Sequence, residues 1–323
     1  MLDVLFFTHA RVDTGFGHAA RAGQLARLLK MCDPRLDIGF VGDFTPGARA
    51  FLAAGGAAFA EDDAHARVGV YDRMDDPEHP ELWDAAALDA ARARCARLVF
   101  MANGLSRPAL PAGVIAIGYK PGGPPPSPPD LYWGLQYAPV AAYMLPEAPV
   151  AREPRRALVA LGGAGGAAAL ATVLGALARI AEITEVDVLD SPVKPLHVSA
   201  APLRVDQELT VHRGVARVTP LLARAGVVVA SYGHLAYEAL ACGAPVCLVG
   251  LKRFQAEYAA RLAARGLAVA GGRLGEVDSA AFTDAVRTTL AQADALSAAA
   301  RRAVDGHGLD RVADLILNLC RAG

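Results

Sequence analysis

The sequence contains little cysteine: five residues in 323, namely Cys32, Cys95, Cys242, Cys247 and Cys320. They form no CxxC pair and no Cys/His set with the spacing of zinc ligands, so the pattern predicts neither a disulfide framework nor a metal site. A chain of this length can bury enough apolar surface in two domains to fold without either. We expect five reduced thiols, buried as small apolar side chains in a reducing compartment.

A surplus of charge of one sign is also lacking. The 32 Lys and Arg residues nearly balance the 33 Asp and Glu residues, which gives a formal net charge of −1. Proteins that bind nucleic acid usually show a basic surplus or a basic patch, so we expect no nucleic-acid partner. A hydrophobic content of 54% excludes disorder for most of the chain. The expected ligand is a small molecule.

No segment has the pattern of a membrane span or a secretion signal. The apolar run near the N-terminus is short, and no basic region precedes it. Residues 157–178 carry no charge, but they are mostly Ala and Gly, with GGAGG in the middle and no aromatic anchors. That composition favours a strand, a glycine loop and a helix. We expect a soluble, cytoplasmic protein, and membrane contact is not indicated.

Short apolar runs alternate with helical patterns along the chain, which indicates βαβ units and parallel sheets. In the first half, strands are expected at 2–7, 37–41, 67–71 and 97–101, and helices at 18–30, 46–54 and 80–95. In the second half, strands are expected at 157–161, 185–189, 227–230 and 245–250, and helices at 167–181, 217–225, 235–242 and 255–265. Three more helices, at 279–291, 293–304 and 309–321, end the chain.

Proline-rich composition marks a boundary between two domains. The prolines of PGGPPPSPPD, at 121–130, cannot donate ladder hydrogen bonds and favour an extended path, and a second stretch with proline follows at 145–154. We expect an α/β protein with two doubly wound, Rossmann-like domains, 1–145 and 152–323, facing a central cleft. Its C-terminus is helical, and the helices after Val304 could cross back to the first domain. Ligands should bind at the carboxyl ends of the strands, in the cleft.

The first segment suited to chemistry is THARVDTGFGHAAR, which follows the first strand. Gly15 and Gly17 let the backbone approach a ligand closely. His18 and Arg21 open the next helix, where free N–H groups and the helix dipole favour an anion. The dipole disfavours the imidazolium form of His18, which leaves a neutral imidazole available as a general base. The alternative is an ordinary βα turn with His18 as a capping residue.

The second segment is the glycine loop LGGAGG at 161–166, between a strand and a helix. Its glycines, Gly163 among them, permit close approach to a diphosphate at the start of the helix. It lacks the GK[ST] of a Walker loop. Tight packing of the strand on the helix would explain the same glycines.

The third and richest segment runs from 227 to 266. A strand ends at Ser231 and a helix begins after Gly233. An anionic ligand at this junction would face Ser231, Tyr232 and the backbone N–H groups near His234 and Leu235. Whether His234 binds a ligand or caps the helix stays open.

Further polar residues follow in the same segment. Glu238 lies one turn into the helix, where a carboxylate can accept hydrogen bonds from both hydroxyls of a ribose; the alternative is an acid that stabilises the helix dipole. Lys252, Arg253 and Gln255 open the next helix, and for the two cations the alternative is a solvated loop.

Three blocks are spread over nearly the whole chain: Gly15-x-Gly17-His18-x-x-Arg21, Ser231-x-Gly233…Glu238…Gly243-x-Pro245…Gln255, and Asp305-Gly306-x-Gly308-x-x-Arg311. Together they resemble the nucleotide-sugar glycosyltransferases of the GT-B fold. Within that superfamily the chain looks most like the branch of the pseudaminic-acid-pathway UDP-sugar hydrolase and the spore-coat polysaccharide glycosyltransferase-like proteins. It is more distantly similar to the peptidoglycan UDP-N-acetylglucosamine transferase.

The resemblance implies a role for each matching residue. His18 would be the base that activates a water or an acceptor hydroxyl. Asp13, which is not part of the matching blocks, is the second catalytic candidate if His18 only caps the helix. Glu238 would bind the ribose, and Gln255 would lie near the donor sugar and the phosphates. The other residues assigned to nucleotide-sugar binding are Gly15, Gly17, Arg21, Gly163, Ser231, Tyr232, Gly233, His234 and Leu235. No metal or cofactor is expected, because in such enzymes helix N-termini and backbone N–H groups take the metal's place at the diphosphate.

The leading hypothesis is a metal-independent glycosyltransferase that moves a sugar from a UDP-sugar-like donor to a hydroxyl or amine of a small-molecule or glycan acceptor. A UDP-sugar hydrolase, which uses water at the same site, is the alternative. A nucleotide-sugar-binding protein without turnover is a third hypothesis. It is suggested by Gly233-His234-Leu235-Ala236, which departs from the family's GGSTxxE pattern and has an imidazole in place of two hydroxyl contacts.

Overall fold

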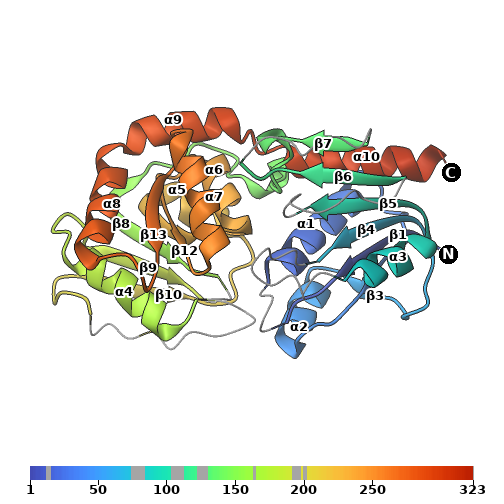
Figure 1. Ribbon diagram of the computed structural model, residues 1–323, viewed down its shortest axis with the longest axis horizontal. Coiled ribbons are helices and arrows are strands. Elements are labelled where there is room, and N and C mark those ends of the chain that lie inside the picture. Colours follow the sequence, from blue (N-terminus) through green and yellow to red (C-terminus); the bar gives the residue numbers. More distant parts are fainter. Residues whose placement is uncertain are drawn as a thin grey trace. The chain divides into compact units, whose positions relative to one another are not determined.

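The computed structural model describes residues 1–11, 16–73, 84–102, 113–121, 130–162, 165–190, 198 and 202–322. The chain forms two compact units: Met1–Ala141 with His307–Gly323, and Ala142–Gly306. Each unit has its own parallel sheet with helices packed on it (Figure 1). Among the described residues, no helix combines the length and the apolar character that crossing a bilayer would require.

The first unit contains a seven-stranded sheet in the order β3-β2-β1-β4-β5-β6-β7. Its strands are β1 (Leu2–Thr8), β2 (Ile38–Val41), β3 (Ala58–Phe59), β4 (Ala66–Asp72), β5 (Cys95–Ala102), β6 (Val114–Gly118) and β7 (Leu131–Trp133). All neighbouring pairs are parallel. The chain moves outward from β1 to β3 and then outward on the other side from β4 to β7. The carboxyl ends of β1 and β4 therefore form the switch point at which ligands of such sheets bind.

Apolar side chains of β1 and α1 supply much of the first unit's core. The run from Val4 to Phe7 is buried on both faces of the strand, as a central parallel strand requires. Leu25 and Leu29 recur at helical spacing in α1 and are also buried. The unit's helices are α1 (Gly17–Cys32), α2 (Pro46–Ala54), α3 (Ala85–Ala93), the short 3-10 helix η2 (Leu135–Tyr137) and α10 (Gly308–Ala322).

The second unit contains a six-stranded parallel sheet in the order β10-β9-β8-β11-β12-β13. Its strands are β8 (Glu153–Ala160), β9 (Glu185–Leu189), β10 (Glu208–His212), β11 (Ala225–Ser231), β12 (Val246–Gly250) and β13 (Val269–Arg273). Its helices are η3 (Ala142–Met144), α4 (Ala167–Ala178), α5 (Thr219–Arg224), α6 (His234–Cys242), α7 (Arg253–Ala264), α8 (Ser279–Ala291) and α9 (Ala293–Ala303). The switch point here lies between β8 and β11.

The predicted fold class is confirmed: the chain has two doubly wound α/β domains and a helical C-terminus. The expected helix at 80–95 is shorter than predicted, since α3 ends at Ala93 and Cys95 already belongs to β5; residues 80–83 lie outside the described residues. Five strands were not expected. They are β3, β6, β7, β10 and β13.

The first proline-rich stretch lies inside the first unit. Its first and last residues, 121 and 130, lie in the connection between β6 and β7, which pair in one sheet. Residues 122–129 lie outside the described part of the chain. The units divide between Ala141 and Ala142, within the expected interval of 121–154. The sequence assigned 152–323 to the second domain, whereas α10 packs in the first unit, where the backbone N–H of Leu309 donates to the carbonyl of Val140 over 2.9 Å.

The cysteines only partly follow the expectation of burial. All five are free thiols, and Cys242, Cys247 and Cys320 are buried. Cys95 is half-buried and Cys32 is exposed. Cys32 is the last residue of α1, where the buried face of the helix has ended, so the prediction of burial is wrong there.

Candidate functional site

In both units, predicted site residues lie at the switch point of the sheet. His18 and Arg21 are on α1, which begins near the carboxyl end of β1. Ser231 is the last residue of β11, and Gly233 precedes α6. Each unit therefore carries its own candidate site.

A histidine–carboxylate pair lies at the switch point of the first unit. His18 is the second residue of α1, Asp72 is the last residue of β4, and Nδ1 of His18 is 2.8 Å from Oδ1 of Asp72. The N-cap of α1 is Phe16, and its side chain makes no capping bond. The alternative that His18 caps the helix is therefore wrong. Its side chain joins α1 to β4 instead.

Arg21, one turn further along α1, binds the same carboxylate. Its Nε donates to Oδ2 of Asp72 over 2.6 Å, and its Nη2 donates to Oδ1. Its Nη1 donates to the hydroxyl of Tyr119, which directly follows β6. Asp72, Arg21 and Tyr119 are 1%, 2% and 3% exposed, so protein encloses the whole group. The nucleotide-binding role assigned to Arg21 stays a prediction.

These contacts set the charge of each group. Burial alone would raise the pKa of Asp72, but the charge of Arg21 and the hydrogen bonds from His18 and Arg21 lower it to about 2. Burial lowers the pKa of His18, although the Asp72 carboxylate opposes that shift. Burial raises the pKa of Tyr119 to about 12. At neutral pH the site therefore holds a carboxylate, a neutral imidazole and a neutral phenol.

The protonation states determine which ring nitrogen of His18 carries the lone pair. A carboxylate can only accept hydrogen bonds, so Nδ1 of the neutral ring must carry the proton that it donates to Asp72. The lone pair then lies on Nε2, the ring nitrogen that is not bound to Asp72. Nε2 is therefore the atom that can accept a proton from a substrate.

A second imidazole, His9, follows β1 directly and lies beside His18. The two ring centroids are 5.9 Å apart, with the planes at 65°. Burial, followed by the charges of His18 and Arg73, lowers the pKa of His9 to about 3. His9 is therefore neutral over the whole range in which a general base would operate.

Three predicted residues, Asp13, Gly15 and Gly163, lie outside the described residues. Gly17 is described, and it is the first residue of α1. Within the parts of the chain that the structure covers, no three His, Cys, Asp or Glu side chains gather as ligands for a metal ion. That no cofactor is needed stays a prediction.

In the second unit, the glycine loop and the end of β11 lie together. Oγ of Ser231 donates to the carbonyl of Leu161 over 2.9 Å, and Gly162 has a φ of +66°, in the left-handed region that favours glycine. Gly166 and Gly233 are the N-caps of α4 and α6, and neither helix has a side-chain cap. Two helix N-termini therefore open at one edge of the sheet, where their N–H groups suit a diphosphate.

The start of α6 holds a second contact between an imidazole and a carboxylate. His234 and Leu235 are its first two residues, and Nε2 of His234 is 3.2 Å from Oε1 of Glu238, one turn later. The side chains of His234 and Glu238 are both largely enclosed. Glu238, the predicted ribose ligand, is thus next to the imidazole that stands where the GGSTxxE pattern has a hydroxyl residue. Their roles toward a nucleotide stay predictions.

Gln255 connects the loops that follow β11 and β12. Its Oε1 accepts from the backbone N–H groups of Leu251 at 2.9 Å and Lys252 at 3.0 Å. Its Nε2 donates to the carbonyl of Tyr232 over 2.9 Å. The ring of Tyr232 stacks on Tyr258 with the centroids 5.2 Å apart. In the structure, Gln255 and Tyr232 hold the shape of the two loops.

The third sequence block packs α10 against the first unit. A Cβ on Gly308 would overlap the backbone carbonyl of Ala138, so this close approach requires glycine. Nη1 of Arg311 donates to the carbonyl of Gln136 over 2.8 Å. Gly306 has a φ of +79° just before the helix. These contacts explain the motif by packing.

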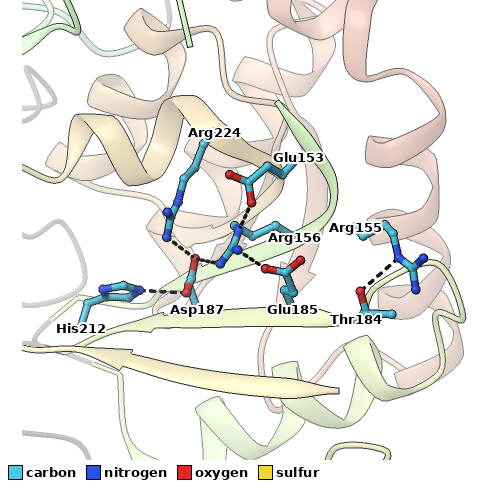
Figure 2. A network of polar contacts seen from close by, with 8 residues as sticks. All are labelled: Glu153, Arg155, Arg156, Thr184, Glu185, Asp187, His212 and Arg224. Carbon is cyan, nitrogen blue, oxygen red and sulfur yellow. Dashed lines mark hydrogen bonds and ion pairs between the residues drawn. The ribbon is translucent and has the colours of Figure 1, made fainter. Parts of the chain in front are cut away.

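An ionic network in the second unit was not predicted (Figure 2). Asp187, in the middle of β9, is 1% exposed, and Nε2 of His212 lies 2.8 Å from its Oδ1. Its Oδ2 accepts from Nη1 of Arg156 at 3.0 Å and from Nη2 of Arg224 at 3.3 Å. Burial would raise the pKa of Asp187, but the bonds from His212 and Arg156 lower it. The network satisfies a buried charge and joins β8, β9, β10 and α5.

Three residues of the first cluster were not predicted from the sequence: Asp72, Tyr119 and His9. Each is a polar residue directly at the end of an apolar strand, within RVGVYD, VIAIGY and VLFFTH. That position was the available signal, because the ends of parallel strands form the binding edge. The signal cannot say which strand ends are neighbours, since β1 and β4 are separated in the chain by β2 and β3.

Comparison with known proteins shows similarity at the level of structure. No protein-family model and no curated protein matches the sequence. The calicheamicin glycosyltransferase CalG4 matches with a TM-score of 0.62 at 18% identity, over 99% of this chain and 98% of that one. The spinosyn rhamnosyltransferase SpnG, complexed with spinosyn aglycone, matches with a TM-score of 0.60 at 17% identity, over 97% and 100%. MurG of Acinetobacter baumannii matches with a TM-score of 0.58 at 14% identity, over 98% and 99%.

At these identities the similarity establishes the fold. The chain has the two Rossmann-like domains of the GT-B glycosyltransferases, as its sequence blocks predicted. The branch that contains the pseudaminic-acid-pathway hydrolase is not singled out by these neighbours and stays a prediction.

Proposed function

We propose that this protein is a glycosyltransferase that moves a sugar from a nucleoside-diphosphate donor to a hydroxyl or amine of an acceptor. The observation that carries the proposal is the neutral His18, oriented by the buried Asp72 at the switch point of the first unit. A base held in one tautomer by a carboxylate is the arrangement that general-base catalysis uses on unrelated folds. The glycosyltransferase fold supports the reaction class.

The proposed reaction is a displacement at the anomeric carbon of the donor sugar. The acceptor gives its proton to Nε2 of His18 while its oxygen or nitrogen forms the bond to that carbon. The bond from the carbon to the diphosphate oxygen breaks, and the nucleoside diphosphate leaves. Asp72 stabilises the imidazolium and stays ionised. The N-termini of α4 and α6 would stabilise the charge on the diphosphate without a metal ion.

The donor is proposed to carry uridine diphosphate. Among the structural neighbours, SpnG is complexed with thymidine diphosphate and VinC with dTDP, so nucleoside diphosphates are the class of ligand to test. A carboxylate at Glu238 can accept from both ribose hydroxyls, whereas a deoxyribose offers only one. We therefore expect UDP to bind more tightly than dTDP. Since SpnG is complexed with a spinosyn aglycone, small molecules are suitable first acceptors to test.

A donor screen with product analysis tests the proposal. The protein is incubated with UDP-sugars and dTDP-sugars, with and without mixed acceptors, and nucleotide release and product masses are measured. Wild type should form acceptor-dependent product, and His18→Gln should lower the rate by roughly 10²–10⁴-fold with unchanged UDP affinity. His65→Gln, which changes an exposed histidine, is the matched control. Free sugar formed equally without acceptor would instead identify a hydrolase. Binding without turnover of any donor would contradict catalysis.

A further inference from the structure

Arg21 belongs to the same cluster as His18, yet no step of the proposed reaction uses it. We propose that Arg21 is a positioning residue: its guanidinium holds both oxygens of Asp72, keeps Oδ1 directed at Nδ1 of His18, and compensates the charge of that carboxylate. The inference rests on the proposed role of His18 as the base. It gives Arg21 a task within the protein in place of a contact with the nucleotide.

The geometry of the guanidinium fixes the orientation of the carboxylate. Nε of Arg21 is bound to Oδ2 at 2.6 Å, and Nη2 is bound to Oδ1. Nη2 also lies 3.4 Å from Nδ1 of His18, because both nitrogens approach the same oxygen of Asp72. Turning the carboxylate away from His18 would break both bonds to Arg21 at once. Only an arginine offers this planar fork, whereas a lysine is a point charge.

Tyr119 in turn fixes Arg21 from the side of β6. Its hydroxyl accepts from Nη1, and the guanidinium carbon lies 5.5 Å from the centroid of its ring. Since Arg21 and Tyr119 are both buried, the guanidinium has little freedom to turn. The contacts form a chain from β6 through α1 to β4, and it ends at the base.

The charges around His18 give Arg21 a second effect. The charged and titratable groups near the ring are Asp72 from β4, Arg21 from α1, Lys120 and Tyr119 after β6, and His9 after β1, with Arg11 and Arg73 acting on His9. Arg21 balances the charge of Asp72, so the carboxylate orients the ring without strongly favouring the imidazolium. Without Arg21, the carboxylate beside His18 would favour the protonated ring, which has no lone pair to accept a proton from the substrate.

Burial argues against Arg21 as a ligand of the donor phosphates. The side chain is 2% exposed, and all three of its nitrogens already donate to protein groups. A phosphate would have to displace Asp72 or Tyr119 and leave that group buried without its partner, which is costly. The two roles therefore predict different kinetics.

The test compares Arg21→Met, Arg21→Lys and the control Arg27→Met, which changes an exposed arginine on the same helix. The titration of His18 is followed by NMR of its ring proton in the free protein, and kcat and the donor KM are measured against pH. Arg21→Met should raise the titration midpoint of His18 by about one pH unit and lower kcat, most strongly at acid pH, with an unchanged donor KM. Arg21→Lys should keep the midpoint near the wild-type value and still lower kcat. The control should match wild type.

A raised donor KM together with an unchanged midpoint would overturn the inference and return Arg21 to the nucleotide site. The NMR titration needs no turnover, so it fails or succeeds separately from the proposed function. If Arg21→Met shifts the titration midpoint of His18 but the protein transfers no sugar, only the proposed function is contradicted. If Arg21→Met does not fold, Tyr119→Phe replaces it. Loss of the hydroxyl that anchors Arg21 should give a smaller shift of the same sign, and no shift would count against the inference.

Discussion

At the scale of single residues, position in the strand separates two otherwise similar clusters. Both Asp72 and Asp187 are buried, and each binds one histidine and at least one arginine. Asp187 lies in the middle of β9, where its partners come from neighbouring strands and α5. Asp72 is the last residue of β4, so its histidine stands at the binding edge of the sheet. Only the first cluster is therefore placed for chemistry.

Because Asp72 holds His18 in one tautomer, we expect a large effect of Asp72→Asn. The carboxamide can donate a hydrogen bond to Nδ1 of His18, which would leave the proton on Nε2 and remove the lone pair that accepts the substrate proton. We expect kcat to fall by roughly 10²–10⁴-fold with little change in the donor KM. Steady-state kinetics at pH 7.5 measure both. Asp43→Asn, at an exposed carboxylate, is the control, and an Asp72→Asn variant as active as this control would refute the role of the pair.

The depressed pKa of His9 predicts a loss of stability in acid. Between its ordinary value near 6.5 and its folded value of about 3, the unfolded chain binds a proton that the folded chain does not. The free energy of unfolding therefore falls as the pH falls through this window, by about 1.4 kcal/mol per pH unit. Urea unfolding at pH 7.5 and 5.0 should show wild type losing about 2 kcal/mol more than His9→Gln. Equal losses in the two proteins would contradict the assignment.

At the scale of elements, the docking of α10 depends on one glycine. Gly308→Ala places a Cβ against the carbonyl of Ala138, and backbone cannot move aside as a side chain can. We expect thermal or urea unfolding to show a loss of about 1–3 kcal/mol. Gly175→Ala in α4 is a control of opposite sign, because its Cβ meets no atom within 4 Å and alanine favours a helix by about 0.5–1 kcal/mol. Equal effects of the two substitutions would exclude the packing explanation.

The same scale shows why some strands could be predicted and others could not. Residues 4–7 of β1, residues 157–160 of β8 and residues 225–230 of β11 are apolar runs buried on both faces of the strand, so hydrophobicity alone predicts them. In contrast, β3 and β7 have only two and three residues, and β13 contains two glycines that weaken the pattern. At the site, GxGH identified His18, but Asp72 needed the strand order. The periodicity of the sequence predicts helices and strands. Which strand ends become neighbours depends on the order of the strands in the sheet, and periodicity does not give that order.

At the scale of the whole molecule, one plan is used twice. In each unit, the first strand in the chain lies inside the sheet, between the second and the fourth strand of that unit. β1 lies between β2 and β4, and β8 lies between β9 and β11, so each unit has a switch point of the same kind. The first unit has His18 and Asp72 there, and the second has two helix N-termini, Ser231 and Glu238. This distribution predicts a division of labour, with proton transfer in the first unit and nucleotide binding in the second.

The division of labour predicts how single and double variants bind UDP. Glu238→Ala removes a charged acceptor for the ribose hydroxyls and should weaken binding by about 1.5–3 kcal/mol, whereas His18→Gln should leave the affinity unchanged. Because the two residues belong to separate units, the double variant should bind UDP as Glu238→Ala does. Calorimetry measures the affinities, and Glu257→Ala, at an exposed carboxylate on α7, is the control. Wild type with UDP at 100 times its dissociation constant should gain about 2.7 kcal/mol in stability. A loss of UDP affinity in His18→Gln that equals the loss in Glu238→Ala would show that the nucleotide is not held by the second unit alone.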